Sequence, residues 1–376
     1  MHTPAVEANN VLLAKSGAEL GKQIFGLYGL AQGAEDLKDY ALHFDLTVPF
    51  ARYVLDWESE LTFPFKRYQI QPVRRGERPQ KGRYREFFQC DLDVIWRKDT
   101  NQSYLYYDAE VIFTFSQTYQ EILKNLHIND TPVMHISNRK VLVGFLRSLI
   151  SEGEVPAVSV LIDKYQKIGK ENFLAALQDL GISPENIQKI LAFVRLKIEV
   201  SSLDALASLA DTPLFQEGVA ELREVVSLIE TLKTSFNLPC PYVVDFQIVR
   251  GQDYYTGTIF EAMLESDADF GAVGGGGRYG ELTGYIDNKK DIYTGVGASI
   301  GLSKLLAKIF EETTEKHHTI AEYLFLNFPE TFDTTLTLAA TFQSQGKNIE
   351  IYPIEDKFGK QLGYADKKGI PFVIIL

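Results

Sequence analysis

The sequence of 376 residues predicts an α+β domain, built from an antiparallel sheet with flanking helices and a helical insertion, followed by a small α/β domain. Two observations predict this order. First, a stretch rich in Leu, Ala, Glu and Lys, about residues 155–238, lies between two regions with strand patterns. Second, strand patterns alternate regularly with helix patterns after about residue 319. The hydrophobic content of 45% is enough for more than one core. We therefore expect domains over residues 1–318 and 319–376.

The first part of the chain alternates strand patterns with a basic connection. Strand patterns cover Phe44 to Val48, Tyr68 to Val73 and Phe87 to Ile95. The connection Arg75 to Arg85 is rich in Gly, Pro and Arg, so the two strands beside it read as an antiparallel hairpin with a long loop. Apolar residues at helical spacing then predict a helix over Tyr104 to Leu123, and a strand follows at Pro132 to Ser137.

The insertion is predicted to be helical, because it has hardly any strand signal and contains segments such as Glu171 to Leu180 and Gln216 to Thr234. The sheet then resumes. Strands are expected at Tyr242 to Arg250 and Thr258 to Leu264, followed by the glycine run Gly274 to Gly277 and a helix over Ala298 to Phe310.

The tail predicts a parallel, helix-covered sheet. Its elements are a strand (Tyr323 to Phe328), a helix (Thr331 to Gln345), a strand (Asn348 to Tyr352), a helix (Gly359 to Lys368) and a strand (Pro371 to Leu376). A unit of this kind with no closing helix suggests an α/β domain that is incomplete at its C-terminus.

Charge and cysteine usage exclude several classes of protein. Lys and Arg total 38 against 50 for Asp and Glu, and the net charge of −12 disfavours purely electrostatic binding of nucleic acid. Any such contact needs a local basic patch. The two cysteines, Cys90 and Cys240, form neither a CxxC pair nor a secreted disulfide pattern, and no side chains have metal-ligand spacing. The start has no signal-peptide pattern, so a cytoplasmic protein is expected.

Two segments combine arginine with chemistry-bearing neighbours. The hairpin connection gathers Arg74, Arg75, Arg78, Lys81, Arg83 and Arg85 against the single acid Glu77. Such a cationic fork suits phosphate, although a solvated basic loop is equally consistent. The segment VRGQDYYTG places Arg250, Tyr254 and Tyr255 between glycines; a buried arginine there needs an anionic ligand or an internal ion pair.

Two glycine-rich segments and two acidic segments are weaker candidates. Gly274 to Tyr279 is a weak nucleotide signal that more often marks a bulge or hairpin, and Gly295 to Leu302 allows either tight packing or room for an adenine ring. Acidic and polar residues alternate in HFDLTVPF (Asp45, Thr47) and in FFQCDLDV (Gln89, Asp91, Asp93). Their strand alternation predicts one shared face, which is either a site for a cation such as an α-amino group or an exposed polar surface.

Taken together and in order, these segments resemble histidyl-tRNA synthetases, which are class II aminoacyl-tRNA synthetases. RRGERPQKGRYREFFQ is similar to motif 2, RGQDYYTGTIFE and GGGGRYGELTG to the two histidine-specific motifs, and GVGASIGLSKL to motif 3. The resemblance implies a histidine–tRNA ligase that activates histidine with ATP and transfers it to the 3' end of tRNA(His). The alternative is a non-catalytic, synthetase-like regulatory subunit of histidine biosynthesis.

The resemblance also implies residue roles. Arg75 and Arg250 would be catalytic and contact the ATP α-phosphate from opposite sides, Arg85 would hold the outer phosphates bridged by Mg²⁺, and Gly297 and Lys304 would complete the ATP site. Lys304 stands where the family has arginine. The implied histidine-binding residues are Asp45, Thr47 and Gln89 at the α-amino group, Asp93, Tyr255 and Tyr279 nearer the imidazole, and Arg250 and Tyr254. Arg78, Lys81 and Arg83 would reach the tRNA acceptor end.

The ends carry two further expectations from the resemblance. Pro4 aligns near the end of motif 1, which helps to form the class II homodimer, so this chain is expected to dimerise less well than an intact enzyme. The tail, with KQLGYADKKGIPFVIIL, resembles the anticodon-binding domain of the family. No side-chain metal site is expected.

Overall fold

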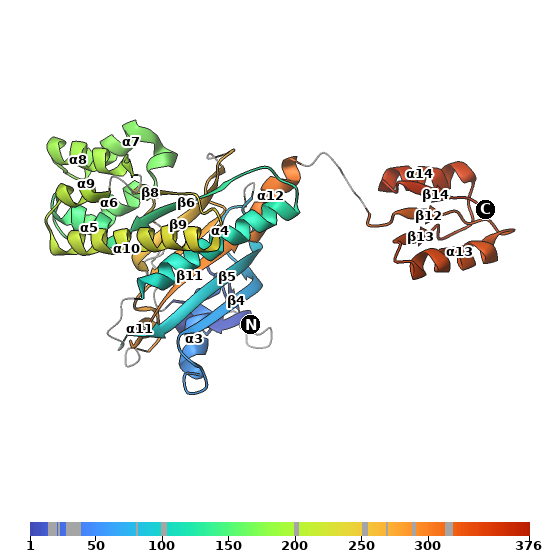
Figure 1. Cartoon of the computed structure of the whole chain (residues 1–376), viewed down its shortest axis with the longest axis horizontal. Helices are drawn as coiled ribbons and strands as arrows, with labels where there is room; N and C mark the ends of the chain where they lie inside the picture. Colours follow the sequence, from blue (N-terminus) through green and yellow to red (C-terminus); the bar gives the residue numbers. More distant parts are fainter. Residues whose placement is uncertain are drawn as a thin grey trace. The chain divides into compact units, whose positions relative to one another are not determined.

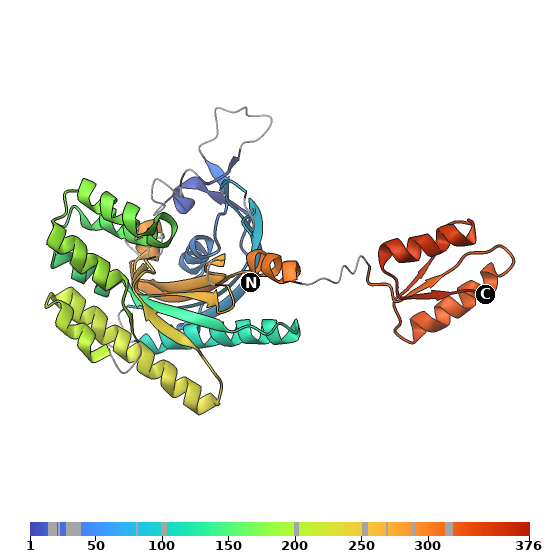
Figure 2. The same ribbon diagram turned by 90° about the horizontal axis from the view of Figure 1, so that it is seen from above.

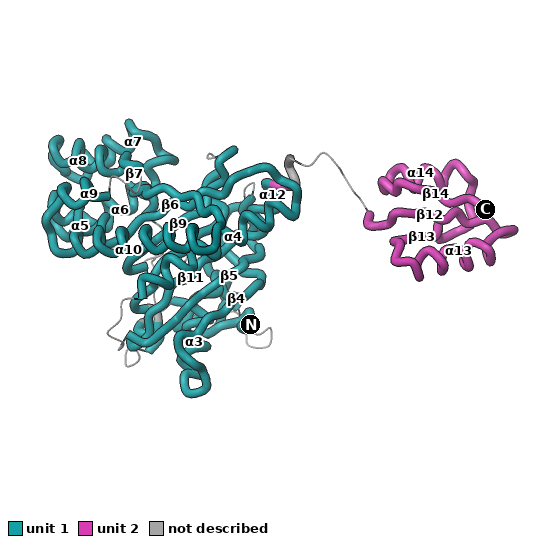
Figure 3. The backbone as a smooth tube through the Cα atoms, viewed as in Figure 1, with its two compact units in different colours: residues 1–308 teal, residues 309–376 magenta. Residues whose placement is uncertain are grey.

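A computed structural model shows two compact units, residues 1–308 and 309–376, which are described separately (Figures 1 and 3). The structure describes the chain except residues 14–20, 22, 28–38, 80–81, 99–103, 199–202, 250–254, 268–269, 288–290 and 313–318. Within the described part, no helix has the length and apolar character needed to cross a membrane.

The first unit is built on an eight-stranded sheet. The strand order is β4 (Phe65–Arg74), β5 (Glu86–Arg97), β11 (Tyr293–Gly301), β10 (Gly274–Tyr279), β9 (Tyr255–Leu264), β6 (Pro132–Asn138), β8 (Tyr242–Asp245) and β7 (Lys197–Ile198). All neighbours are antiparallel except β6 and β8, so the predicted antiparallel sheet contains one parallel pair. The glycine run forms the central strand β10, which pairs with β9 on one side and β11 on the other. The sequence instead favoured a bulge or hairpin, and the structure has only one irregularity of register there, between Gly277 and Tyr279.

Helices cover one face of this sheet. Figure 2 shows α4 (Leu105–Asn125) and α10 (Pro213–Phe236) on one side and the blue N-terminal segment on the other. Apolar side chains at helical spacing on α4, among them Val111 and Phe115, are buried, which confirms the helix predicted from that spacing. The helix α5 (Arg139–Arg147) begins directly after β6, where the Asn138 side chain accepts from the Lys140 N–H at 2.9 Å.

The N-terminal segment packs on the other face. It consists of β1 (Val6–Ala8), α1 (Asn9–Leu12), β2 (Gly26–Leu27), β3 (Tyr40–Leu42) and α3 (Thr47–Asp56). The strand predicted over Phe44 to Val48 is wrong, because α3 begins there: Asp45 Oδ1 accepts from the Val48 N–H at 3.1 Å and satisfies one of the free donors of the first turn. Phe50 on α3 is fully buried in the core beneath the sheet.

The insertion is helical as predicted. It contains α6 (Val155–Asp163), α7 (Tyr165–Asp179), α8 (Pro184–Val194), α9 (Leu203–Leu206) and α10. Stacked aromatic rings join it to the sheet: Phe145 and Phe193 have centroids 4.1 Å apart, and Phe193 and Phe246 have centroids 4.7 Å apart. After the insertion, the helix expected from Ala298 begins later, because residues 298–301 continue β11 and α12 covers Leu302–Glu312.

The second unit has a three-stranded parallel sheet. The strand β12 (Tyr323–Phe325) lies between β13 (Ile349–Ile351) and β14 (Phe372–Ile374), and α13 (Phe332–Ser344) and α14 (Phe358–Lys368) connect the strands. The predicted order of elements is confirmed. Each strand is shorter than predicted, because the apolar residues at the ends of the predicted strands lie in loops.

Candidate active site

Alternate residues of β4 and β5 form a polar row on the sheet face opposite α4. The row consists of Arg67, Gln69 and Gln71 on β4 and of Gln89, Asp91 and Asp93 on β5. Successive side chains of a strand point to opposite faces, so the shared-face prediction for the β5 residues is confirmed. All six residues are buried, with at most 8% of their surface exposed. The alternative of an exposed polar surface is therefore wrong.

Arg67 is the centre of this row. Its Nη2 lies 2.8 Å from Asp93 Oδ2 and 3.9 Å from Asp91 Oδ2, and it donates to the Leu46 carbonyl at 3.1 Å. Its Nη1 donates to Gln69 Oε1, and the guanidinium lies 4.2 Å from the centre of the Phe50 ring. These contacts fix the position and orientation of the buried guanidinium group.

Asp93 joins the row to β10 and β11. The Tyr279 hydroxyl donates to Asp93 Oδ1 at 3.0 Å. A Cβ atom at Gly297 would lie 2.1 Å from the same oxygen, and one at Gly295 would lie 2.5 Å from Tyr279 Cε2. The two glycines of β11 therefore make room for these side chains. For this glycine-rich segment the sequence left two alternatives open, tight packing or room for an adenine ring.

Burial raises the pKa of all three carboxyl groups in this region. Desolvation raises the pKa of Asp45 to about 6 and that of Asp91 to about 7, and it also raises the pKa of Asp93. The positive charge of Arg67 opposes the shift in each case, and the charge of Arg75 also lowers the pKa of Asp45. The site thus holds more carboxylate than its arginines neutralise.

The predicted histidine ligands are partly assembled in this region. Tyr255 on β9 is buried and is the register partner of Tyr279. Thr47 is the first residue of α3 and follows Asp45 by two positions, but on a helix and not on the predicted strand. The Gln89 side chain donates to Ser299 Oγ on β11 at 2.7 Å. Arg250 and Tyr254 lie outside the described residues.

The hairpin connection brings Arg75 next to the acidic row. Its Nε donates to the Phe44 carbonyl at 3.0 Å, its N–H donates to the Arg85 carbonyl at 2.8 Å, and its guanidinium lies 5.2 Å from the centre of the Phe87 ring. Arg78, Arg83 and Arg85 are exposed, and Arg83 lies 3.3 Å from Glu77. Lys81 lies outside the described residues. The described loop cations are thus largely available to an anionic ligand.

Lys304 at the start of α12 is held by backbone carbonyls. Its ammonium donates to Phe270 O at 3.0 Å and to Ala272 O at 2.8 Å, and it lies 4.7 Å from the centre of the Phe270 ring. Burial, together with the charge of Arg83, lowers the Lys304 pKa to about 8. The neighbouring Ser303 accepts from the Phe88 N–H at 3.0 Å, which ties α12 to β5.

Comparison with known proteins identifies the family of this chain. Residues 1–305 match the family model described as histidyl-tRNA synthetase. Over the whole chain, the sequence is 40% identical to histidine--tRNA ligase of Clostridium tetani and 39% identical to that of Stenotrophomonas maltophilia, covering 82% of each relative. The chain belongs to the histidyl-tRNA synthetase family. The resemblance seen in the motifs is thereby confirmed.

Solved structures agree with this family. The crystal structure of histidyl-tRNA synthetase from Nostoc sp. PCC 7120 matches with a TM-score of 0.78 and 35% identity, over 100% of this chain and 83% of that one. An ATP phosphoribosyltransferase regulatory subunit/histidyl-tRNA synthetase from Bacillus halodurans C matches with a TM-score of 0.74 but 19% identity, over 100% and 88%. Because the sequence identity to this second structure is only 19%, the match shows a shared fold and no more.

Sequence reasoning missed Arg67, the arginine that organises the acidic row of this family member. A signal was present, because Arg67, Gln69 and Gln71 alternate along β4 with the same period as the polar residues of β5. Gln69 extends the row, since its Nε2 donates to Gln71 Oε1 at 2.7 Å and to Thr3 Oγ1 at 3.0 Å. Recognising the pair of alternating strands would have placed Arg67 opposite Asp93.

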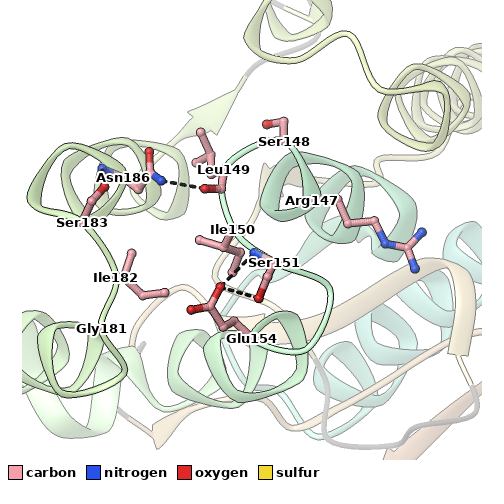
Figure 4. Close-up of a pocket in the computed structure, with 10 residues that line it drawn as sticks. All are labelled: Arg147, Ser148, Leu149, Ile150, Ser151, Glu154, Gly181, Ile182, Ser183 and Asn186. Atoms are coloured by element: carbon pink, nitrogen blue, oxygen red, sulfur yellow. Dashed lines mark hydrogen bonds between the residues drawn. The ribbon is translucent and has the colours of Figure 1, made fainter.

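A concave region in the insertion is explained by the hydrogen bonds of its own residues. It lies between the end of α5 and the starts of α6 and α8 (Figure 4). Glu154 Oε2 accepts from the Ser151 N–H at 2.8 Å and from its hydroxyl at 2.7 Å, and Asn186 donates to the Leu149 carbonyl at 2.6 Å. These bonds close the turn between the helices and explain the shape of this region without a ligand.

Proposed function

We propose that this chain is a histidine–tRNA ligase: it activates histidine with ATP to histidyl-adenylate and pyrophosphate, then transfers histidine to the 3' end of tRNA(His). Membership of the family and relatives named histidine--tRNA ligase support this function. The observation that carries it is a buried group of polar side chains: Tyr279 donates to Asp93, and the charges of Asp93 and Arg75 both act on Asp45, so acceptors for a histidine lie near a cation for phosphate. The regulatory-subunit alternative has only the fold-level likeness in its favour.

Histidine recognition is proposed to use both edges of the imidazole. A carboxylate such as Asp93 accepts from one ring N–H and a phenol such as Tyr255 meets the other edge, while Tyr279 holds Asp93 through its hydroxyl group. A site built to hydrogen-bond polar groups rejects analogues that lack them, because its buried groups would be left unpaired. The α-amino group is proposed to meet Asp45, Thr47 and Gln89. Arg250 and Tyr254 are proposed to join the pocket, on the strength of the motif alone.

ATP is the proposed second substrate, with Mg²⁺ as part of the substrate complex. The reaction is attack of the histidine carboxylate on the α-phosphorus, so positioning and charge stabilisation account for most of the catalysis. Arg75 and Arg250 are proposed to contact the α-phosphate, Arg85 the outer phosphates, and Lys304 and Gly297 the rest of the nucleotide.

The proposed macromolecular partners are tRNA(His) and a second copy of the chain. Arg78, Lys81 and Arg83 are proposed to contact the acceptor end, supported by the exposure of Arg78 and Arg83. A homodimer is supported by exposed apolar side chains at the sheet edge, where Tyr68, Ile70 and Phe88 are 72%, 45% and 47% exposed. Sedimentation velocity would test it. A cytoplasmic location is proposed because both cysteines, Cys90 and Cys240, are free.

The test is ATP–pyrophosphate exchange that depends on histidine. We expect exchange with histidine and not with other amino acids, and its loss in the Arg250→Ala variant. A chain that is folded but gives no exchange would refute the enzyme function. Exchange with several amino acids would refute the specificity while leaving the reaction class intact.

A further inference from the structure

Four buried acceptor oxygens in the active site have no hydrogen-bond partner among the described residues, and one of them, Asp93 Oδ2, forms an ion pair with Arg67 Nη2 at 2.8 Å, which leaves three. They are Asp45 Oδ2, Gln89 Oε1 and Asp91 Oδ1. Their residues are 2%, 8% and 2% exposed. Buried polar atoms are normally hydrogen-bonded, and an unpaired one destabilises the fold. Three of them in one cluster of side chains therefore indicate a ligand that supplies donors.

The rest of each side chain is anchored, so the three oxygens are held in place. Asp45 Oδ1 accepts from the Val48 N–H at 3.1 Å, and Gln89 Nε2 donates to Ser299 Oγ at 2.7 Å. The Ser299 side chain hydrogen-bonds to the Asp91 carboxylate, and Asp91 Oδ2 lies 3.9 Å from Arg67 Nη2. Each side chain thus uses one polar atom for support and leaves the other for a ligand. A preorganised acceptor loses little freedom when the ligand binds.

The charges show what kind of donor is required. Arg67 lies closest to Asp93, at 2.8 Å, and the Tyr279 hydroxyl occupies the other oxygen of Asp93. The charged groups that face Asp91 are Arg67, Asp93 and Asp45, and Arg75 acts on Asp45. Asp93 is thus the carboxylate in direct contact with an arginine, whereas among the described residues Asp45 and Asp91 form no ion pair closer than 3.9 Å. A cation with several N–H donors fits them better than a neutral group.

We propose that Asp91 is a further ligand of the substrate's α-ammonium group, completing with Asp45 and Gln89 a set of three acceptors for three N–H donors. An ammonium group has three donors and no acceptor, which matches the three unpartnered oxygens. This assignment rests on the proposed function, since it takes histidine as the substrate. It adds a specificity-determining residue on β5, between Gln89 and Asp93 on the same face.

Two histidine analogues separate the amine from the rest of the molecule. Histamine keeps the amine and the imidazole but lacks the carboxylate, whereas imidazolepropionate keeps the carboxylate and the imidazole but lacks the amine. We expect the Asp91→Asn substitution in the full chain to raise the Kd for histamine about 10- to 100-fold, since it removes a charge-assisted hydrogen bond. The Kd for imidazolepropionate should change less than about twofold. Isothermal titration calorimetry measures both values without any need for catalysis.

The controls use neighbours on the same strand. Cys90→Ser alters the adjacent residue, whose side chain points to the opposite face, and should leave both Kd values unchanged. Asp93→Asn should weaken both analogues, because both retain the imidazole. Retained imidazolepropionate binding shows that the Asp91→Asn pocket is folded; if that variant fails to fold, Asp91→Ser removes the same charge with a smaller side chain.

The outcomes distinguish this assignment from the proposed function. Weakening of histamine alone supports Asp91 as an ammonium ligand. Equal weakening of both analogues, or unchanged histamine binding, overturns it even when the chain shows histidine-dependent exchange. If neither analogue binds the unsubstituted chain and exchange is absent, the proposed function fails, and the assignment of Asp91 fails with it.

Discussion

Arg278 and Tyr279 are adjacent in β10, but their side chains enter opposite faces of the sheet and meet two different acidic environments. On the face covered by α4, Arg278 donates to both oxygens of the buried Asp108, at 3.0 and 2.8 Å, and to the Tyr104 carbonyl at 3.2 Å. On the other face, Tyr279 donates to Asp93, which shares Arg67 with Asp91. One arginine serves one carboxylate in the first case and two in the second.

The comparison separates a structural ion pair from a binding site. The pair of Arg278 and Asp108 is bidentate and self-contained, and it fixes α4 against the centre of the sheet. The group on the other face is short of positive charge and leaves oxygens without donors among the described residues. Burial raises the pKa of Asp108 as it does that of Asp91, so a raised pKa alone does not distinguish the two faces. The carboxylate and amide oxygens without donors among the described residues distinguish the binding site from the structural pair.

The largest effect is expected from breaking the self-contained pair. Arg278→Met leaves Asp108 buried without the arginine that pairs with it, and we expect the free energy of unfolding to fall by about 3–5 kcal/mol. Urea denaturation measures this change. The double variant Arg278→Met/Asp108→Leu should recover most of the loss, because no charge remains buried. A single variant as stable as the parent would show that the pair contributes nothing to the fold.

Asp93→Asn should have the opposite profile, with a large effect on activity and a small one on stability. We expect kcat/KM for histidine in pyrophosphate exchange to fall about 100-fold, as for a lost charge-assisted hydrogen bond. The free energy of unfolding should change by only about 1 kcal/mol, because Arg67 retains Asp91 as a partner. A loss of stability as large as that of Arg278→Met would remove the distinction between the two faces.

The pH dependence of stability should reveal the excess of carboxylate. The folded-state pKa is raised to about 6 for Asp45 and about 7 for Asp91, above the value of about 3.9 in the unfolded chain. Their contribution to stability is therefore fully present below pH of about 4 and is lost as the pH rises through these folded-state values. We expect Asp91→Asn to be about 2 kcal/mol more stable than the parent at a pH of about 8, and equal to it at a pH of about 4. Urea midpoints across this range are the measurement; parallel profiles for the two proteins would contradict the assignment.

Lys304 should give the smallest effect, because neutral carbonyls hold its ammonium. We expect Lys304→Met to raise the KM for ATP about fivefold and to lower the free energy of unfolding by about 1 kcal/mol, the worth of its lost hydrogen bonds. The Lys304 pKa of about 8 adds a sharper test. The KM for ATP of the parent should rise as the pH passes about 8, while that of Lys304→Met stays flat. Identical pH profiles would exclude Lys304 from the ATP site.

Local patterns predicted most of the elements but not their exact limits. The helix α4 and the hairpin of β4 and β5 follow from periodicity, which depends only on which residues an element can bury on one face. The segment around Asp45 was predicted incorrectly, because its apolar and polar residues alternate like a strand while the Asp45 side chain caps the first turn of α3. The glycines of β10 were also misjudged, since a strand without side chains looks like a turn until both of its neighbours are known.

By itself, the sequence determined the order of elements, the helical insertion, the α/β tail and the family, because these depend on local periodicity and on contiguous motifs. Only the tertiary structure decided which polar residues form one site. Arg67 and Asp91 lie on β4 and β5, and Tyr279 and Gly297 lie on β10 and β11. These two pairs of strands are distant in sequence, and the contacts between them depend on the register of β5 with β11. The structure also decided which acceptors remain unpaired, since that depends on every neighbour at once.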